Sequence, residues 1–144
     1  MFYSKLTENK WLIRIKRNEK IIESIKTFCT HLNINSAQIS GIGACNFAKI
    51  GAYIFSEEKY LSNEYSGDYE ILSLLGNVSK IDEKYYPHLH ILLGNKNNET
   101  IGGHLFEANV SATCEIFLET FSKKLNRNKD KETGLNLIQL EEEI

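Results

Sequence analysis

The segment from Pro87 to Gly94 places the strongest constraint on the fold that this chain can adopt. Its sequence is P-H-L-H-I-L-L-G. Its two histidines, His88 and His90, are two residues apart in an otherwise apolar run. In a β-strand, residues i and i+2 point to the same face of the sheet. Both imidazoles would therefore lie on one face, and the intervening aliphatic side chains on the other. The segment predicts a strand that presents two histidines side by side.

A third histidine, His104, follows the glycine pair Gly102-Gly103 a short distance along the chain. We expect a glycine-rich turn here, because glycine allows backbone dihedrals that would let His104 approach the first two histidines. A neutral imidazole is the commonest protein ligand for metals. Three of them can hold a divalent ion and leave one coordination position open.

These residues predict a metal site formed by His88, His90 and His104. Zinc is the ion that such a ligand set suits best, with nickel, copper and iron as alternatives. The competing interpretation is that His88 and His90 are ordinary exposed strand residues, because short motifs often match by chance.

A catalytic role for such a site would need a general base. A three-histidine site with an open position can activate water by lowering its pKa, as hydrolases and hydratases do. Glu70 and Glu115 are the candidate bases, since each lies in a strand-like segment. The alternative for Glu115 is a solvent-facing residue or an ion-pair partner, because charged residues in strands are usually solvated. The sequence leaves enzymatic activity open.

The charge of the chain bears on nucleic-acid binding. Its 144 residues carry a formal net charge of −2, which argues against a strongly basic surface, since phosphate contacts require clustered Lys and Arg. The one basic cluster consists of Lys123, Lys124, Arg127, Lys129 and Lys131. This cluster could contact phosphate. The alternative is a solvated loop, because asparagine and acidic residues are interspersed in it.

The cysteines and the apolar runs indicate where such a chain functions. The chain has an odd number of cysteines, namely Cys29, Cys45 and Cys114, and no Cys-x-x-Cys motif. We therefore expect buried thiols, with no disulfide bonds and no thiolate metal ligands. The amino terminus has no apolar signal-peptide core, and no apolar run approaches the roughly 20 residues that span a bilayer. We therefore expect a cytoplasmic protein without membrane contact.

One helix followed by a series of strands is the pattern along the chain. Asn18 is expected to cap the helix, with Glu19 in its first turn and its end near Asn33. Apolar residues recur at helical spacing between them. Strands are expected over 11–16, 39–44, 49–55, 59–65, 70–78, 88–93, 113–118 and 135–140, with turns at 79–86 and 95–98. This order predicts an α+β fold, a mainly antiparallel β-sheet flanked by helices, in a single domain over residues 1–144.

Five short motifs resemble, in order and spacing, those of the PPC (plant and prokaryote conserved) domain family. They are Gly41-Ile-Gly-Ala44, Gly67-Asp-Tyr-Glu-Ile-Leu-Ser-Leu-Leu-Gly-Asn77, His88-Leu-His90, Gly102-Gly-His-Leu105 and Thr133-Gly-Leu135. The resemblance implies a homotrimer of α+β subunits. It also implies a metal site, because His88, His90 and His104 match three histidines of prokaryotic members that are arranged like metal ligands.

The resemblance also suggests DNA binding as a function. Plant members carry AT-hook segments, which bind the minor groove, and prokaryotic members are often described as DNA-binding by analogy. This chain has no AT-hook, since no Arg-Gly-Arg core occurs. Asp68 and Tyr69 stand where the plant pattern has Arg and Phe. In the family context, Arg127 and Asp130 fit a structural ion pair or a pocket lining as well as a nucleic-acid contact.

The residues and the resemblance together predict a homotrimer that binds a divalent metal and serves either as a small-molecule-binding protein or as a metal-dependent enzyme. A DNA-binding regulatory protein is the alternative. Strands that are apolar on both faces, such as residues 70–78 and 88–93, favour the homotrimer, because neighbouring subunits could cover the second face.

Overall fold

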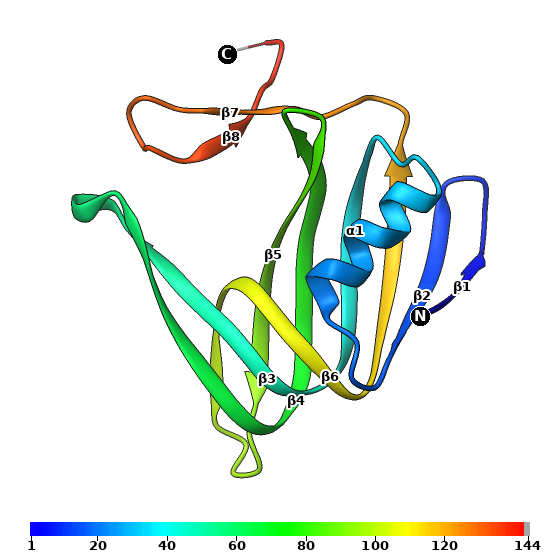
Figure 1. Cartoon of the computed structure of the whole chain (residues 1–144), viewed down its shortest axis with the longest axis vertical. Helices are drawn as coiled ribbons and strands as arrows, with labels where there is room; N and C mark the ends of the chain where they lie inside the picture. The colour runs from blue at the N-terminus through cyan, green and yellow to red at the C-terminus, as the bar shows by residue number, and fades with distance from the viewer. Residues whose placement is uncertain (143–144) are drawn as a thin grey trace.

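The computed structural model describes residues 1–142, and strands make up most of it (Figure 1). Six strands form one antiparallel sheet in the order β1-β2-β6-β3-β4-β5, and β7 and β8 form a small second sheet. The elements are β1 (Phe2–Lys5), β2 (Lys10–Lys16), α1 (Ile21–His31), β3 (Ser36–Ile54), the 3-10 helix η1 (Phe55–Glu57), β4 (Lys59–Ile81), β5 (Lys84–Gly94), β6 (Thr100–Phe121), β7 (Arg127–Lys129) and β8 (Asn136–Ile138).

Strand β6 closes the sheet on itself, because its first residues pair with β5 and most of the strand pairs with β3. His104 on β6 consequently lies opposite both His90 on β5 and Gly51 on β3. The register of β3 shifts between residues 41 and 43 and again between 45 and 47. Such bulges bend a strand, and Figure 1 shows β3, β4 and β6 curving at the lower end of the molecule.

Helix α1 covers one face of this sheet with the apolar stripe predicted from the sequence. Its buried residues are Ile21, Ile22, Ile25, Phe28 and Cys29. They pack with the inward-facing aliphatic residues of the strands, such as Ile13, Ile15, Ile116 and Leu118. The core therefore lies between α1 and one face of the sheet, and all three cysteines are buried in it as free thiols.

The expectation of several flanking helices is wrong, because α1 is the only α-helix in residues 1–142. The strands are also longer than predicted. Segments 39–44 and 49–55 form the single strand β3, and segments 59–65 and 70–78 form β4. The polar junction residues and Gly67 do not end these strands, because pairing with the neighbouring strands resumes on both sides of the register shifts there.

The predicted cap of the helix is wrong, whereas its predicted end is confirmed. Lys20 is the N-cap residue of α1, and Asn18 lies before it in a turn with a φ of 68°. At the other end Leu32 caps the helix, and Asn33 follows with a φ of 50°. Asn18 and Asn33 are of a residue type that tolerates this left-handed conformation, so the structure uses both as turn residues.

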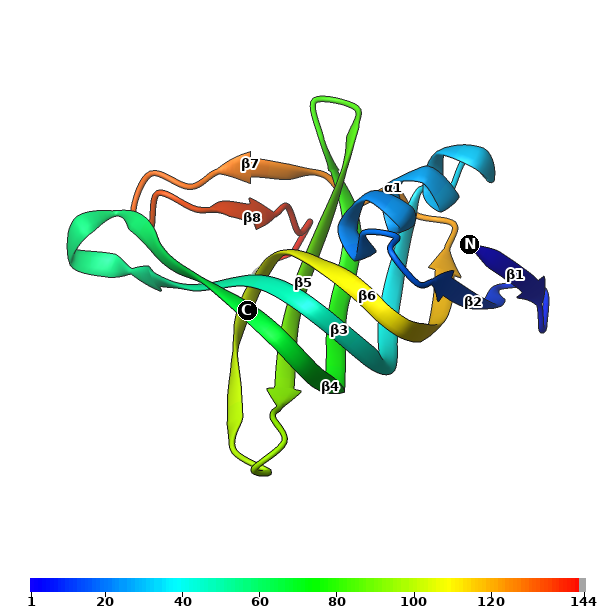
Figure 2. The same cartoon turned by 60° about the horizontal axis from the view of Figure 1, so that its bottom comes forward.

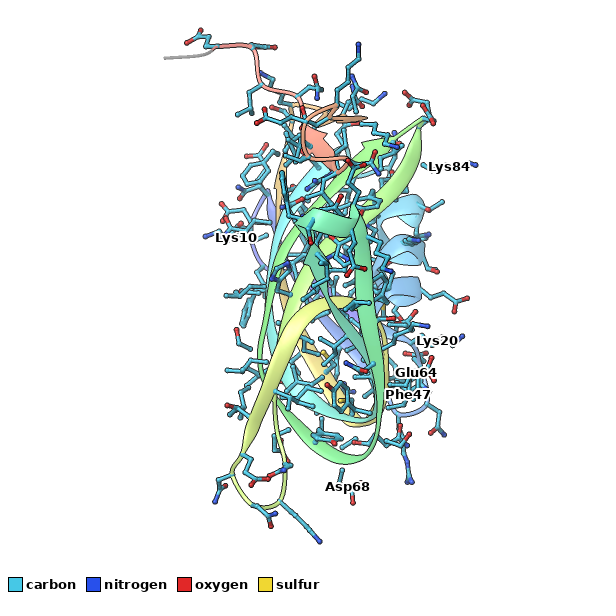
Figure 3. All side chains as sticks on the ribbon, turned by 90° about the vertical axis from the view of Figure 1, so that its left-hand side faces the viewer. Lys10, Lys20, Phe47, Glu64, Asp68 and Lys84 are labelled. Atoms are coloured by element: carbon cyan, nitrogen blue, oxygen red, sulfur yellow. The ribbon has the colours of Figure 1, made fainter. Side chains whose placement is uncertain are left out.

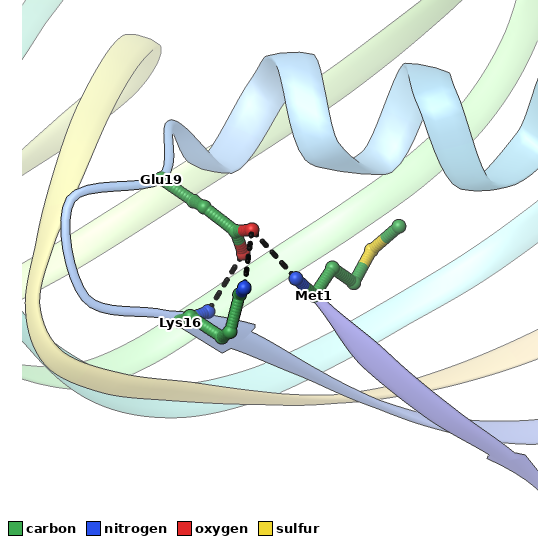
Figure 4. Close-up of polar contacts among 3 residues, drawn as sticks. All are labelled: Met1, Lys16 and Glu19. Atoms are coloured by element: carbon green, nitrogen blue, oxygen red, sulfur yellow. Dashed lines mark hydrogen bonds and ion pairs between the residues drawn. The ribbon is translucent and has the colours of Figure 1, made fainter.

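Glu19 anchors the turn before α1, as Figure 4 shows. Its carboxylate accepts hydrogen bonds from the Met1 ammonium group at 2.6 Å and from the Lys16 backbone N–H at 2.8 Å. Burial raises the pKa of Glu19, but these hydrogen bonds and the positive charges of Met1 and Lys16 outweigh it and hold the pKa below its ordinary value. The carboxylate therefore stabilises the fold only while it is ionised.

We expect Glu19→Gln to lower the free energy of unfolding at pH 7 by about 0.5–1 kcal/mol. Because the folded-state pKa lies below the unfolded one, this contribution is present above pH ~4.3 and is lost as the pH falls through the folded value. Urea unfolding at pH 7 and pH 3 measures it. A difference between the two proteins that is as large at pH 3 as at pH 7 would contradict this account.

The face of the sheet opposite α1 is apolar and carries no helix. Its exposed side chains on the central strands are Ile42, Leu72, Leu75, Leu92 and Phe117. We call these five residues the apolar face. Figure 3 views the sheet edge-on, with α1 on one side and Lys10 extending from the other.

In the described residues, no helix is long and apolar enough to cross a membrane.

Candidate metal centre

Two adjacent strands bring the three predicted histidines together. His88 and His90 lie on β5, as the alternation in the sequence predicted, and His104 lies on β6 directly opposite His90. His104 is thus a strand residue, and the expectation of a glycine-rich turn is wrong. Four residues, Asn95 to Asn98, form the predicted turn that joins the two strands and sets this register.

Two glycines allow the backbones around the histidines to approach closely. A side chain at Gly103 would place its Cβ 2.7 Å from the carbonyl oxygen of Gly51, on the strand that flanks His104. A side chain at Gly76 would collide with the carbonyl oxygen of His88. Both contacts are with backbone atoms, which cannot rotate away. These positions therefore require glycine for the strands that carry the histidines to pair as they do.

The three imidazoles form a compact triangle. Their ring centroids are 5.4 Å apart for His88 and His90, 5.1 Å for His88 and His104, and 5.6 Å for His90 and His104. One ring nitrogen from each lies within 4.8 Å of the others. His104 is buried, His88 is partly buried and His90 is exposed, so the centre is open to solvent on the side of His90.

Aromatic side chains surround the buried end of the centre. The rings of Tyr60 and Phe106 lie 4.8 and 5.0 Å from the His104 ring, measured between centroids. Tyr86 lies beyond His88 at 6.4 Å. No local pattern predicts these neighbours, because Tyr60 occurs in a polar stretch with no apolar or ligand motif.

The surroundings keep two of the histidines neutral. Burial lowers the pKa of His88 to about 4, and the positive charge of Arg127 and the neighbouring imidazoles act in the same direction. Burial also lowers the pKa of His104, with further contributions from His90 and Arg127. A neutral imidazole is the form that binds a metal ion.

One atom of the centre lacks a partner. The Nδ1 of His104 is buried, and no hydrogen-bond partner reaches it within residues 1–142. Buried polar atoms are nearly always paired, and an unpaired one is costly. A metal ion would satisfy this nitrogen, so the orphaned atom and the set of three imidazoles both fit a divalent transition metal.

Arg127 on β7 lies against the centre and is itself buried. Its Nε donates to the Ser79 hydroxyl at 2.7 Å, and its Nη1 donates to the Asn136 carbonyl at 2.7 Å. Its Nη2 donates to Asn77 Oδ1 at 3.0 Å and to His88 Nδ1 at 3.2 Å. Burial lowers the pKa of the Arg127 guanidinium, which nevertheless stays protonated.

The basic cluster predicted from the sequence is therefore not one continuous basic surface. Arg127 points into the protein, which favours the pocket-lining alternative over a solvated loop. Lys123 pairs with Glu141, and Lys124 pairs with Glu83. Asp130 accepts hydrogen bonds from the backbone and hydroxyl of Thr133 and shapes the turn between β7 and β8. Figure 2 shows β7 and β8 extending towards the far end of the β3–β4 hairpin.

The two candidate bases do not reach the histidines within one chain. Glu70 on β4 is opposite Gly94, whereas Leu75 is opposite His90. Five residues of strand therefore separate Glu70 from the centre, about 16 Å at the usual rise. Glu115 is farther along β6 and lines, with Glu70, a different hollow beside the apolar face.

The fourth histidine of the chain lies outside the centre. His31, in the last turn of α1, contacts the hydroxyl of Tyr3, with 3.0 Å between the ring nitrogen and the oxygen.

The lowered pKa of His88 predicts acid sensitivity of the metal-free protein. The unfolded chain takes up a proton on this histidine near pH 6.5, whereas the folded protein does so only near pH 4. Stability should therefore fall as the pH drops from 6.5 to 4, by roughly 2–3 kcal/mol from this group.

Urea unfolding of the metal-free protein at pH 7 and pH 4.5 measures this loss. His88→Asn is the comparison, because asparagine offers an acceptor for Arg127 and does not titrate. The prediction fails if both proteins lose the same stability between the two pH values.

The fold and the site together define a class of small antiparallel-sheet proteins with a three-histidine centre on paired strands. The model of the Plants and Prokaryotes Conserved (PCC) domain, also abbreviated PPC, matches residues 4–122. The chain belongs to this family, and the resemblance seen in its sequence is confirmed.

Solved structures of similar proteins have the same fold over nearly the whole chain. A metal-containing protein from Archaeoglobus fulgidus is 35% identical, with a TM-score of 0.87 over 97% of this chain and 99% of its own. A plant- and prokaryote-conserved protein from Pyrococcus horikoshii is also 35% identical, with a TM-score of 0.87 over 98% and 96%. A protein from Bacteroides thetaiotaomicron, described provisionally as DNA-binding, is 30% identical, with a TM-score of 0.90 over 95% and 96%. No curated protein matches the sequence.

Proposed function

We propose that residues 1–144 form a single domain that binds one divalent metal ion, with zinc as the preferred ion, through His88, His90 and His104. The observation that carries the proposal is the buried, unpartnered Nδ1 of His104 in a triangle of imidazoles. The similar protein from Archaeoglobus fulgidus is metal-containing, which supports the same property here. The family resemblance supports a homotrimer, and three free buried cysteines are consistent with a cytoplasmic location.

A bound ion would supply Lewis acidity at its open coordination position. The chain's own residues would hold the ion, exclude water on the side of Tyr60 and Phe106, and leave access on the side of His90. An enzymatic role would also need a general base, and Glu70 and Glu115 could serve only from a neighbouring subunit. We therefore propose metal-dependent binding of a small molecule as the primary function.

Elemental analysis of the purified protein, incubated with zinc and then freed of unbound metal, tests the proposal. We expect about one zinc ion per chain. No metal near that occupancy, even after zinc is supplied, would overturn the metal site.

DNA binding is the second candidate, and similarity to the Bacteroides thetaiotaomicron protein favours it. The net charge of −2, the burial of Arg127 and the ion pairs of Lys123 and Lys124 oppose it. Binding to duplex DNA at physiological salt, with an affinity that falls steeply as salt rises, would support this candidate.

A further inference from the structure

We propose that Arg127 enables the histidine centre to bind a small anionic ligand, and that this ligand is a carboxylate. This inference rests on the proposed metal site and names the chemical class of the ligand that occupies its open position. It follows from the charges around the centre and from the hydrogen bonds of the Arg127 guanidinium.

The charges at the centre are all positive or neutral. The three imidazoles contribute no negative charge, and the described part of the chain contains no ion pair between Arg127 and a carboxylate. The four hydrogen-bond partners of Arg127 are a hydroxyl, a backbone carbonyl, a side-chain amide and His88, and none is charged. A divalent ion beside this guanidinium would create a local charge of about +3 without a counter-charge. Buried charges are normally paired, so the loaded centre favours an anion.

The hydrogen bond between Arg127 and His88 gives a second, independent reason. A guanidinium can only donate, so His88 Nδ1 accepts and the proton of the neutral ring is on Nε2. If a metal binds Nδ1, it takes the lone pair that Arg127 uses. If it binds Nε2, the proton moves to Nδ1 and faces the N–H of Arg127. Both routes remove this hydrogen bond.

Metal binding therefore leaves an Arg127 N–H without its acceptor at the edge of the centre. Nη1 has a further N–H, because only one of its two hydrogens is used by the Asn136 carbonyl. The remaining contacts, to Ser79 and Asn77, hold the guanidinium in place. A carboxylate on the open coordination position would accept these hydrogen bonds and supply the missing negative charge.

The experiment uses acetate as the probe and cobalt(II) as the metal, because its visible absorption changes when the ligand at an open position changes. Acetate is titrated into the cobalt-loaded wild type and into Arg127→Gln, with the neutral analogue acetamide as the control ligand. Lys129→Gln is the matched control variant, because it removes one positive charge from an exposed position of the same strand. We expect saturable binding of acetate but not of acetamide.

The expected result is that Arg127→Gln weakens acetate binding roughly 10- to 100-fold and that Lys129→Gln leaves it unchanged. Cobalt content should not fall in Arg127→Gln, because the substitution removes a repulsive charge. If both variants bind cobalt and acetate as the wild type does, the inference about Arg127 is overturned and the metal site stands.

A second measurement applies where Arg127→Gln fails to fold or the wild type binds no metal. In the 15N-labelled wild type, the Arg127 Nε–H resonance is followed by NMR during acetate titration, with and without metal. A saturable shift without metal supports the anion site even though the metal proposal has failed. If the resonance does not shift in either form, the anion site is overturned.

Discussion

Replacing His90 by alanine is expected to lower the zinc content of the purified protein from about one ion per chain to nearly none. A centre with three protein ligands loses a third of its donors in this variant. Loss of an outer partner of a metal ligand already costs 10- to 100-fold in affinity, so loss of a ligand should cost at least about 100-fold. His90 is exposed, and the change should therefore leave the fold intact.

His31→Ala is the matched control, because it removes the histidine that lies outside the centre. Metal content is measured by elemental analysis after both variants and the wild type are loaded with zinc under the same conditions. If His90→Ala and the wild type retain equal amounts of zinc, the triangle of histidines is not the site. If the ion is held by four protein ligands, the metal-binding proposal stands, but the site has no open coordination position for a ligand or for catalysis.

The histidine centre could be predicted from the sequence because its geometry is mostly local. The i, i+2 spacing fixes the common face of His88 and His90, and the turn at residues 95–98 brings the next strand back beside them. The position of His104 in a strand was missed, because a Gly-Gly pair is typical of a turn. Only the close approach of Gly103 to Gly51, a residue far away in the sequence, explains why glycine is needed in that strand.

The extent of the strands was less predictable, because it depends on pairing with distant residues. The segment around Glu64 is polar and reads as a short edge strand, yet it continues β4 because it pairs with β3, where Lys49 forms an ion pair with Glu64 at 3.2 Å. Arg127 was similarly ambiguous. A charged residue in a polar segment is usually solvated, and its burial follows from acceptors on β4, β5 and β8 that no local pattern reveals.

The apolar face leads to the second large prediction, that the protein is a homotrimer in solution and that Leu72→Glu makes it monomeric. Leu72 is 49% exposed in the single chain, and the neighbouring Ile42 is 60% exposed. Contiguous exposed apolar patches on soluble proteins are usually interaction sites. A carboxylate in the middle of such an interface would be buried without a partner, which costs several kcal/mol.

Light scattering over a wide concentration range measures the mass of both proteins. Leu6→Glu is the matched control, because Leu6 is also 49% exposed but lies in the turn between β1 and β2, outside the apolar face. We expect about three times the chain mass for the wild type and for Leu6→Glu, and the mass of one chain for Leu72→Glu. A wild type with the mass of one chain at all concentrations would refute the homotrimer.

The monomeric variant also tests how the metal centre depends on assembly. Across the neighbouring strands β6, β3, β4 and β5, one row of paired residues consists of Phe117, Ser40, Leu75 and His90. Residues that pair directly across strands lie on the same face of the sheet. The apolar face therefore extends to His90, and a neighbouring subunit packed on it would border the centre. All three histidines come from one chain, so Leu72→Glu should still bind zinc. If the monomer instead loses zinc while remaining folded, a ligand must come from the neighbouring subunit, and the proposal of a three-ligand centre with an open position would be wrong.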